Sequence, residues 1–372
     1  MQTKKKIKLP PLKWCVITGI PVILLLVFYI FSKSRSFANA AVKYFSRPAK
    51  DILGTVCSVI PFSVMELMYI AAGVFVIWFI VRTVILTAKA DKKLRTAFKC
   101  CGILLLVVLY FFTAFQWLLG IDYRSDSFRT KSGMYAPGAT AEELYVVAEY
   151  FLTNALRCCD NVERDSEGHF DVEMDEVFAS SVNVYDSLIE EYSFLNCRSR
   201  EPKKMYLFSK ISSYMGFTGV FFPFTGESNI NIDAPACLIP ATIAHELAHQ
   251  RGVYSEQEAN FLGITSCVTS GHDVFTYSGY LSGTINLLNA LYRTDMDMWR
   301  ELRNRISGNV LTDWQDNNTY WDKMESKVTK VSETVYDGYL KANGQALGMR
   351  SYGACVDLLV AYFYPIAAAQ EF

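Results

Sequence analysis

Long runs of hydrophobic residues dominate the first third of the chain. Three of these runs cover residues 14–31, 67–86 and 100–119. Each has about 18–20 residues, the length that a helix needs to cross the hydrocarbon core of a bilayer. Helices on the surface of a soluble protein carry a polar face, and these runs have none. The pattern therefore predicts three transmembrane helices in an N-terminal membrane anchor, residues 1–120.

The pattern changes after residue 120. Residues 121–139 are rich in Ser, Gly and charged side chains, which indicates a linker. Residues 140–372 then form the predicted soluble domain. Within it, apolar residues alternate with other residues around 216–233, as is typical of strands, and a helical pattern follows Pro240. We predict an α+β fold, mostly helical, with a small sheet. Further elements are predicted at residues 141–157 and 172–195 (helices), 204–208 (a strand) and 351–369 (a core helix).

Charge divides the chain in the same place. The whole chain has a net charge of −1, but residues 1–120 hold 16 basic and 3 acidic residues, a net of +13. Residues 121–372 therefore carry a net of −14. An acidic domain repels phosphate, so nucleic acid is excluded as its partner. The expected partners are the lipid bilayer and a peptide or protein substrate.

Basic residues also predict the orientation of the anchor. Lysines cluster before the first run and between the second and third runs, which places both segments in the cytoplasm and the soluble domain outside the cell. The basic residues between the first and second runs oppose this orientation. Ala38-Asn39-Ala40 resembles a signal-peptidase site, but Lys33 and Arg35 separate it from the apolar run. We expect an uncleaved, multi-pass protein of the cell membrane.

The chain has ten cysteines, six of them after residue 120. Their spacing matches no zinc-knuckle pattern. In an extracytoplasmic domain some of them could form disulfides, and as neutral thiols they could equally be packing residues. The sequence leaves both possibilities open.

The candidate chemistry lies in the segment Ala244-His245-Glu246-Leu247-Ala248-His249, which contains the motif H-E-x-x-H. Residues four apart lie on one face of a helix, so the two imidazoles can bind the same ion. Glu246 can then reach a water molecule on that ion. Pro240 suits the first turn of such a helix, and Gly252 suits its C-terminal cap. The pattern predicts one Zn²⁺ ion, with Glu246 as a catalytic residue.

A catalytic zinc site needs a third protein ligand. We predict that Glu256 supplies it after a short turn and that Asn260, one helical turn later, hydrogen-bonds a ligand. Glu258 is a weaker candidate, because Ser255 and Glu258 have the spacing of a capping box that would start a helix. His272 is a further alternative.

These motifs resemble those of the gluzincins, metallopeptidases that carry H-E-x-x-H followed by E-x-x-[AS]-[DN]. The resemblance implies a zincin-like domain in which Glu256 binds zinc and Asn260 supports a histidine. The chain more closely resembles an uncharacterised bacterial membrane family known as domain of unknown function 3810. The shared segments are residues 222–227 (FPFTGE), 245–252, 256–261 and 351–353. Metzincins have a third histidine where this chain has Ser255, a poor zinc ligand.

A peptidase mechanism needs further residues. A hydrogen-bond donor must stabilise the oxyanion, and Tyr352 is the preferred candidate because of its Ser-Tyr-Gly setting. The alternatives are Tyr277, Tyr280 and His272. Arg350, beside Tyr352, is a candidate for substrate binding. Residues 221–225 could pair with an extended substrate by strand addition, which makes substrate-binding residues of Phe222, Phe224 and Thr225.

The expected function is that of a membrane-anchored zinc metallopeptidase that hydrolyses peptide bonds. Two alternatives stay open: a membrane sensor or scaffold that uses a peptidase-like domain, and a zinc amidase that acts on cell-wall material. The intact Glu246 favours an enzyme, since a binding domain has no need of a general base. An intramembrane protease is disfavoured, because the motif lies far from all three apolar runs.

Overall fold

A computed structural model describes residues 12–343, 345 and 352–370. The chain divides into two compact units. The first comprises Met1–Ala49 and Met68–Ser125, and the second comprises Lys50–Leu67 and Asp126–Phe372. The sequence-based division at residues 120–140 did not anticipate that residues 50–67 would join the second unit.

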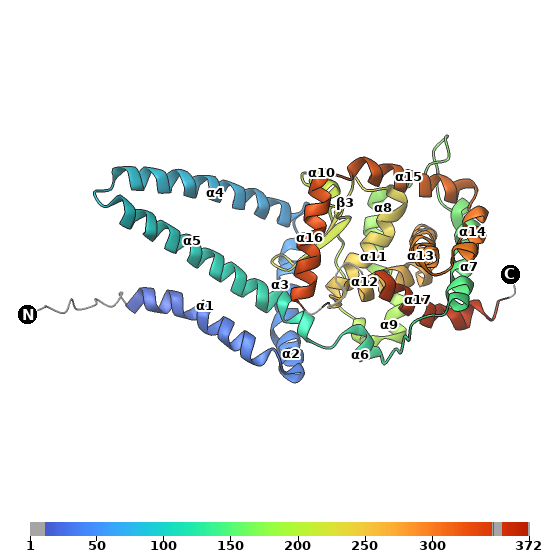
Figure 1. The fold of residues 1–372 in the computed structure, drawn as a ribbon, viewed down its shortest axis with the longest axis horizontal. Coiled ribbons are helices and arrows are strands. Elements are labelled where there is room, and N and C mark those ends of the chain that lie inside the picture. Colours follow the sequence, from blue (N-terminus) through green and yellow to red (C-terminus); the bar gives the residue numbers. More distant parts are fainter. Residues whose placement is uncertain (1–11, 344, 346–351, 371–372) are drawn as a thin grey trace, which may run out of the picture. The chain divides into compact units, whose positions relative to one another are not determined.

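Three long apolar helices dominate the first unit, which includes all but the first turn of α4: α1 (Leu12–Phe31), α4 (Val64–Lys89) and α5 (Lys93–Phe115) (Figure 1). A π-helical turn extends α5 to Gly120, and all three helices are long and apolar enough to cross a membrane. This confirms the three helices predicted from hydropathy. Most of their apolar side chains are exposed, as expected for helices whose solvent is lipid. The three helices fit a membrane protein.

Two hydrogen bonds join α1 to the α5 region within the first unit. The Tyr110 hydroxyl donates to the Ile17 carbonyl (2.8 Å), and Trp117 Nε1 donates to the Leu24 carbonyl (3.2 Å). Both carbonyls belong to α1. The short helix α2 (Arg35–Ala41) follows α1 and begins with Ser34 as its N-cap.

The second unit begins with most of α3 (Arg47–Ser58) and the first turn of α4. Its sheet has three strands in the order β1-β3-β2. β1 (Lys203–Met205) is parallel to β3 (Glu227–Asn231), and β2 (Gly219–Phe222) is antiparallel to it. The predicted strands at 204–208 and 216–233 are therefore present, and a turn with Gly226 at a φ of 64° connects β2 to β3.

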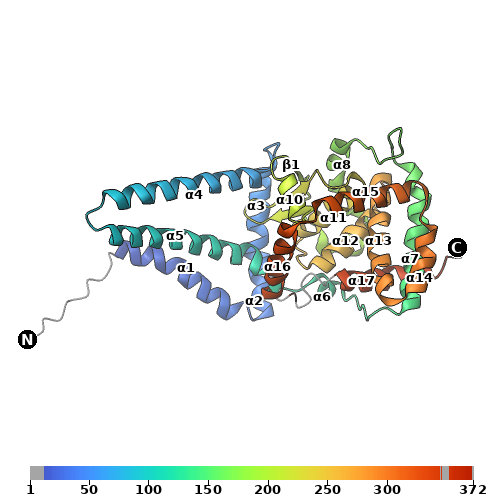
Figure 2. The same cartoon turned by 45° about the horizontal axis from the view of Figure 1, so that its top comes forward.

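Helices make up the rest of the second unit. Figure 1 and Figure 2 both show α11 (Ile239–Gln250), α12 (Glu256–Thr269) and α13 (Asp273–Thr294) between the sheet and α7 (Ala141–Cys158). Their buried apolar residues form one continuous core. The others are α6 (Phe128–Ser132), α8 (Met174–Ser180), α9 (Asp186–Glu191), α10 (Ser209–Tyr214), α14 (Met296–Arg305), α15 (Gly308–Met324), α16 (Lys327–Ala342) and α17 (Tyr352–Ala367).

Two predicted helices have informative outcomes. α17 packs into the core through Leu358, Leu359 and Phe363, as expected for a core helix. The helix predicted at 172–195 is instead split into α8, α9 and short 3-10 turns. The hydroxyl of Ser181, at the break, donates to the Phe178 carbonyl (2.6 Å). Serine side chains compete in this way with the helical pairing of the backbone.

Candidate metal centre

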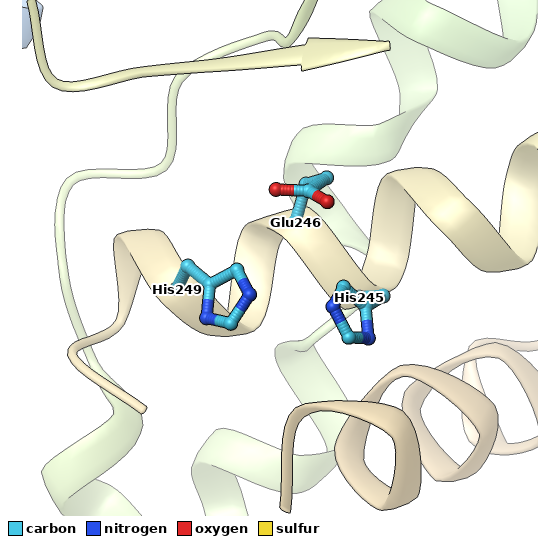
Figure 3. A group of neighbouring side chains, drawn as sticks. All are labelled: His245, Glu246 and His249. Carbon is cyan, nitrogen blue, oxygen red and sulfur yellow. The ribbon is translucent and has the colours of Figure 1, made fainter. Parts of the chain in front are cut away.

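The residues of the H-E-x-x-H motif lie on α11, in the interior of the second unit. The helix begins with Pro240 in its first turn and ends before Gly252, whose φ is 83°. One side of α11 packs against β3 and another against α12. Figure 3 shows His245 and His249 projecting together from α11, with Glu246 pointing toward a strand that passes over the helix. Glu246 and His249 are buried, and His245 is partly buried.

The turn after α11 brings Glu256 to the two histidines. Glu256 Oε2 lies 3.3 Å from His245 Nε2, and Glu256 Oε1 lies 3.9 Å from His249 Nε2. In a tetrahedral zinc site with bonds of about 2.0–2.1 Å, ligand atoms are separated by roughly 3.4 Å. The two-histidine, one-glutamate set therefore fits zinc, although its role as a ligand set remains a prediction. Ligand atoms of Glu246 lie within 4.8 Å of those of the two histidines.

Hydrogen bonds orient two of these side chains. His249 Nδ1 lies 2.7 Å from the Val253 carbonyl. If that nitrogen carries the proton, Nε2 is left to face an ion. The Tyr336 hydroxyl, from α16, donates to Glu256 Oε1 (2.7 Å). These are the outer contacts that commonly fix metal-binding side chains.

Close packing of α12 against α11 fixes the position of His245. A Cβ at Gly263 would lie 2.9 Å from the backbone nitrogen of His245, so only glycine allows this approach. His245 Nδ1 is buried and has no hydrogen bond of normal geometry. Asn260, on α12, is close enough for its side chain to favour protonated His245. Asn260 is thus near the ligand that the sequence analysis expects it to support.

The four ionisable groups have strongly perturbed pKa values in the metal-free chain. Burial raises the pKa of Glu246 to about 8 and lowers that of His249 to about 4. Burial also opposes ionisation of Glu256, but its hydrogen bond with His245 and the charges of both histidines lower its pKa to about 2. For His245, burial lowers the pKa, but the hydrogen bond to Glu256 and the nearby Glu246 charge outweigh it and raise the pKa. Perturbations of this kind cluster at functional sites.

β2 approaches Glu246 directly. A Cβ at Gly219 would lie 2.7 Å from Glu246 Cγ and Oε1, so the strand passes close to the Glu246 side chain and a larger residue would displace it. No described strand pairs with the outer edge of β2. Of the predicted substrate-binding residues, Phe222 and Phe224 contact each other through their rings, with centroids 5.4 Å apart. Thr225 is buried in the following turn, where its amide donates to the Phe222 carbonyl (3.2 Å).

The structure places the alternative ligands elsewhere. The Glu258 carboxylate accepts hydrogen bonds from the amides of Phe128 and Arg129, at the start of α6 (2.9 and 3.0 Å). It therefore caps a different helix from the one expected. Ser255 is the N-cap residue of α12 but makes no side-chain capping bond. The exposed His272 is the N-cap residue of α13, and its ring contacts Phe275.

The oxyanion candidates differ in what they contact. Tyr277 donates to Asp313, and the Tyr280 hydroxyl lies 3.3 Å from that of Tyr150, so both belong to buried hydrogen-bonded pairs. Tyr352 is the first residue of α17, and its side chain is outside the described part of the chain. Arg350 also lies outside the described residues.

Sequence reasoning missed several residues around the site. Tyr254 follows the motif closely, and its ring stacks on that of His249 (9° between planes, centroids 5.8 Å apart). The Lys50 ammonium donates to the Tyr254 hydroxyl (2.7 Å). Gln345 Nε2 donates to the Tyr254 carbonyl (3.2 Å). Lys50, Tyr336 and Gln345 are far from the motif in sequence, so spacing gave no signal for them.

All ten cysteines are free thiols in the structure. Cys237, Cys267 and Cys355 are buried in the core of the second unit. Burial raises the pKa of each of these thiols. They are therefore neutral packing residues, one of the two possibilities that the sequence left open.

Comparisons with known proteins agree with the resemblance but add no activity. No curated protein and no solved structure gives a significant match to the chain. One family does match, over residues 42–360, and it is described as "Protein of unknown function (DUF3810)". The match covers α3, the sheet, the candidate metal centre and most of α17. The chain therefore belongs to the family DUF3810.

Proposed function

We propose that the protein is a membrane-anchored, zinc-dependent metallopeptidase. The observation that carries this proposal is the approach of Glu256 to His245 and His249, with atoms 3.3 and 3.9 Å apart, beside the buried Glu246. His245, His249 and Glu256 would hold the ion. When bound, zinc supplies a Lewis acid that activates water and polarises the carbonyl of the cleaved bond. The three protein ligands leave a fourth position open for that chemistry.

Glu246 would move the protons of the reaction. Its buried carboxylate accepts a proton from the attacking water as the C–O bond forms. It then passes that proton to the nitrogen of the leaving amine as the C–N bond breaks. The raised pKa of Glu246 in the metal-free chain suits a group that both takes up and releases a proton near neutral pH.

The edge of β2, with which no described strand pairs, supports a peptide as substrate. An extended peptide could pair with this edge through its backbone, which would place a peptide bond near Glu246, since β2 passes that residue at Gly219. Phe222 and Phe224 would contact side chains of the substrate. The charge pattern of the anchor favours a site outside the cell, which would act on substrates near the membrane.

The test uses the full chain, purified in detergent and incubated with a mixture of unstructured peptides. We expect cleavage that stops when a chelator removes the metal and returns when zinc is added. Mass spectrometry of the products identifies the cleaved bonds. Cleavage of cell-wall fragments but not of peptides would instead indicate the amidase. Binding of zinc with no hydrolysis of either would indicate the sensor or scaffold.

A further inference from the structure

The helix α3 has two faces of different character. Lys50, Gly54 and Cys57 are buried along one face, with the helical spacing i, i+4, i+7. Ile52 and Val56, on the opposite face, are 65% and 63% exposed, and Val59 follows at 81%. An exposed stripe of large aliphatic side chains on a short helix is unfavourable in water. Some partner is therefore expected to cover it.

The buried face fixes α3 within the second unit. The Lys50 ammonium donates to the Tyr254 hydroxyl and lies 4.3 Å from the centre of its ring. Arg200 packs against Gly54 and forms an ion pair with Asp51 (3.4 Å). A Cβ at Gly54 would come within 2.5 Å of Arg200 Nε. Because these contacts determine the rotation of α3, they also determine where its apolar face points.

A second exposed apolar segment is held beside the start of α4. The Glu66 carboxylate, in the first turn of α4, accepts hydrogen bonds from the amides of Tyr206, Leu207 and Phe208 (2.9–3.2 Å). Tyr206 and Leu207 are 63% and 60% exposed, and Ile211, four residues after Leu207, is 51% exposed. Nearby, the Lys203 ammonium donates to the carbonyls of Ser58 and Ile60 (3.3 and 2.7 Å).

The order of elements along the chain indicates what covers these residues. α1 ends at Phe31 and α4 begins at Val64, and both are long and apolar enough to cross a membrane. If both cross, the intervening segment begins and ends at the same membrane face. The first turn of α4 then lies at the bilayer surface, and its contacts hold Tyr206 and Leu207 there. Amphipathic helices lie in this interface, where Tyr is enriched.

We propose that the second unit docks on the headgroup region of the bilayer through an interfacial edge. This edge comprises Ile52, Val56, Val59, Tyr206, Leu207 and Ile211. Its docking does not depend on the proposed peptidase function. If that function also holds, docking sets the distance of the metal centre from the bilayer. The buried face of α3 reaches Tyr254, which stacks on His249. Docking would therefore hold the centre behind α3, on the side away from its exposed face, and favour bonds close to the bilayer surface.

Photocrosslinking to lipid tests this edge directly. The full chain is reconstituted into vesicles of phosphatidylcholine and phosphatidylglycerol, with p-benzoylphenylalanine replacing either Val56 or Leu207. A positive control carries the same group at Val74, which is exposed within the apolar length of α4. A negative control carries it at the exposed Tyr292, which contacts Trp299 of α14. Figure 1 and Figure 2 both show α14 and α3 at opposite ends of the second unit.

We expect lipid adducts at positions 56 and 207 in yields comparable to position 74 and roughly tenfold above position 292. Mass spectrometry of the intact chain detects them. Adducts at position 74 but at neither 56 nor 207 would overturn the proposal. Crosslinks from 56 and 207 to a second copy of the chain would also overturn it and assign this surface to self-association. Neither readout requires zinc, so failure here is distinct from failure of the proposed peptidase.

Discussion

Two clusters of ionisable side chains in the second unit differ in how completely their charges and hydrogen-bonding atoms have partners. In the first, Arg164 forms two hydrogen bonds with Asp313 (3.2 and 3.0 Å), and its other donors reach the carbonyls of Cys159 and Gly168. Tyr277 also donates to Asp313. The charges are balanced, and the donors have acceptors, as in a cluster that stabilises a fold.

The candidate metal centre lacks this balance. Two carboxylates, Glu246 and Glu256, lie near the same two imidazoles, and the buried atoms Glu246 Oε2 and His245 Nδ1 have no hydrogen-bond partner in the described part of the chain. An unpaired buried polar atom costs roughly 1–3 kcal/mol. The difference supports the proposal that the Arg164 cluster is structural and that the candidate metal centre binds an ion.

The largest expected effect is a loss of peptide hydrolysis without a loss of zinc from the candidate metal centre. Glu246→Gln keeps the shape of the side chain but removes the general base. We expect peptide hydrolysis to fall by about 10²–10⁴-fold, while zinc content stays at the wild-type level. Steady-state rates and metal analysis of the same preparation check both. Full activity in this variant would remove Glu246 from the mechanism.

A change in the Arg164 cluster is expected to lower stability but to leave zinc binding and hydrolysis intact. Arg164→Met leaves Asp313 buried without its cation, which should lower the free energy of unfolding by about 3–5 kcal/mol. Chemical denaturation of the detergent-solubilised chain measures this. Any folded fraction should still bind zinc and hydrolyse peptide. The matched control is Arg300→Met, which breaks an exposed ion pair with Asp297 and should leave stability unchanged. If both variants were equally stable, the cluster would not be structural.

A smaller effect is expected where α16 supports the metal centre. Tyr336→Phe removes the hydrogen bond to Glu256 but keeps the ring that packs against Phe217. Loss of such an outer contact typically lowers metal affinity by about 10–100-fold. Competition with a zinc-binding dye measures the affinity. The control is Tyr339→Phe on the same helix, which should bind zinc as the wild type does. Equal affinity of the Tyr336 variant would show that Glu256 does not depend on this contact.

In metal-free protein, the raised pKa of Glu246 sets the direction in which stability changes with pH. Because the folded pKa of Glu246 is raised to about 8, the folded chain keeps a proton that the unfolded chain has lost between about pH 4.5 and 8. Stability from this group is complete below pH 4.5 and is lost as the pH rises through 8. Glu246→Gln should therefore become progressively more stable than the wild type over this range, as thermal unfolding in EDTA would show. A difference that stayed constant with pH would contradict the raised pKa.

Local patterns in the sequence predicted much of this structure. Hydropathy was sufficient to find the three apolar helices, because a membrane span is encoded by consecutive residues. The spacing of His245 and His249 likewise placed both on one side of α11. Glycine at position 252 indicated where that helix ends. Each of these features depends on residues within one or two helical turns of each other.

The remainder depends on contacts that no local pattern records. The Lys50–Tyr254 contact joins α3 to the candidate metal centre across 204 positions, and composition alone could not indicate that residues 50–67 belong to the second unit. Tyr336 reaches Glu256 from 80 positions away. Glu258 had the spacing of a local cap, but tertiary packing placed the amides of Phe128 and Arg129 within its reach instead. A buried long-range hydrogen bond can therefore replace the local capping bond that the sequence spacing predicts.

The most direct test of the account is the zinc content of the full chain, measured by plasma mass spectrometry after purification in detergent. We predict close to one zinc per chain in the wild type and in the control His272→Ala, whose histidine is exposed on another helix. His249→Ala and Glu256→Ala should lose most of the metal while remaining folded. Zinc that persists in both variants would contradict the proposed ligand set. A folded wild type that binds no zinc, even after reconstitution, would contradict the metalloenzyme itself.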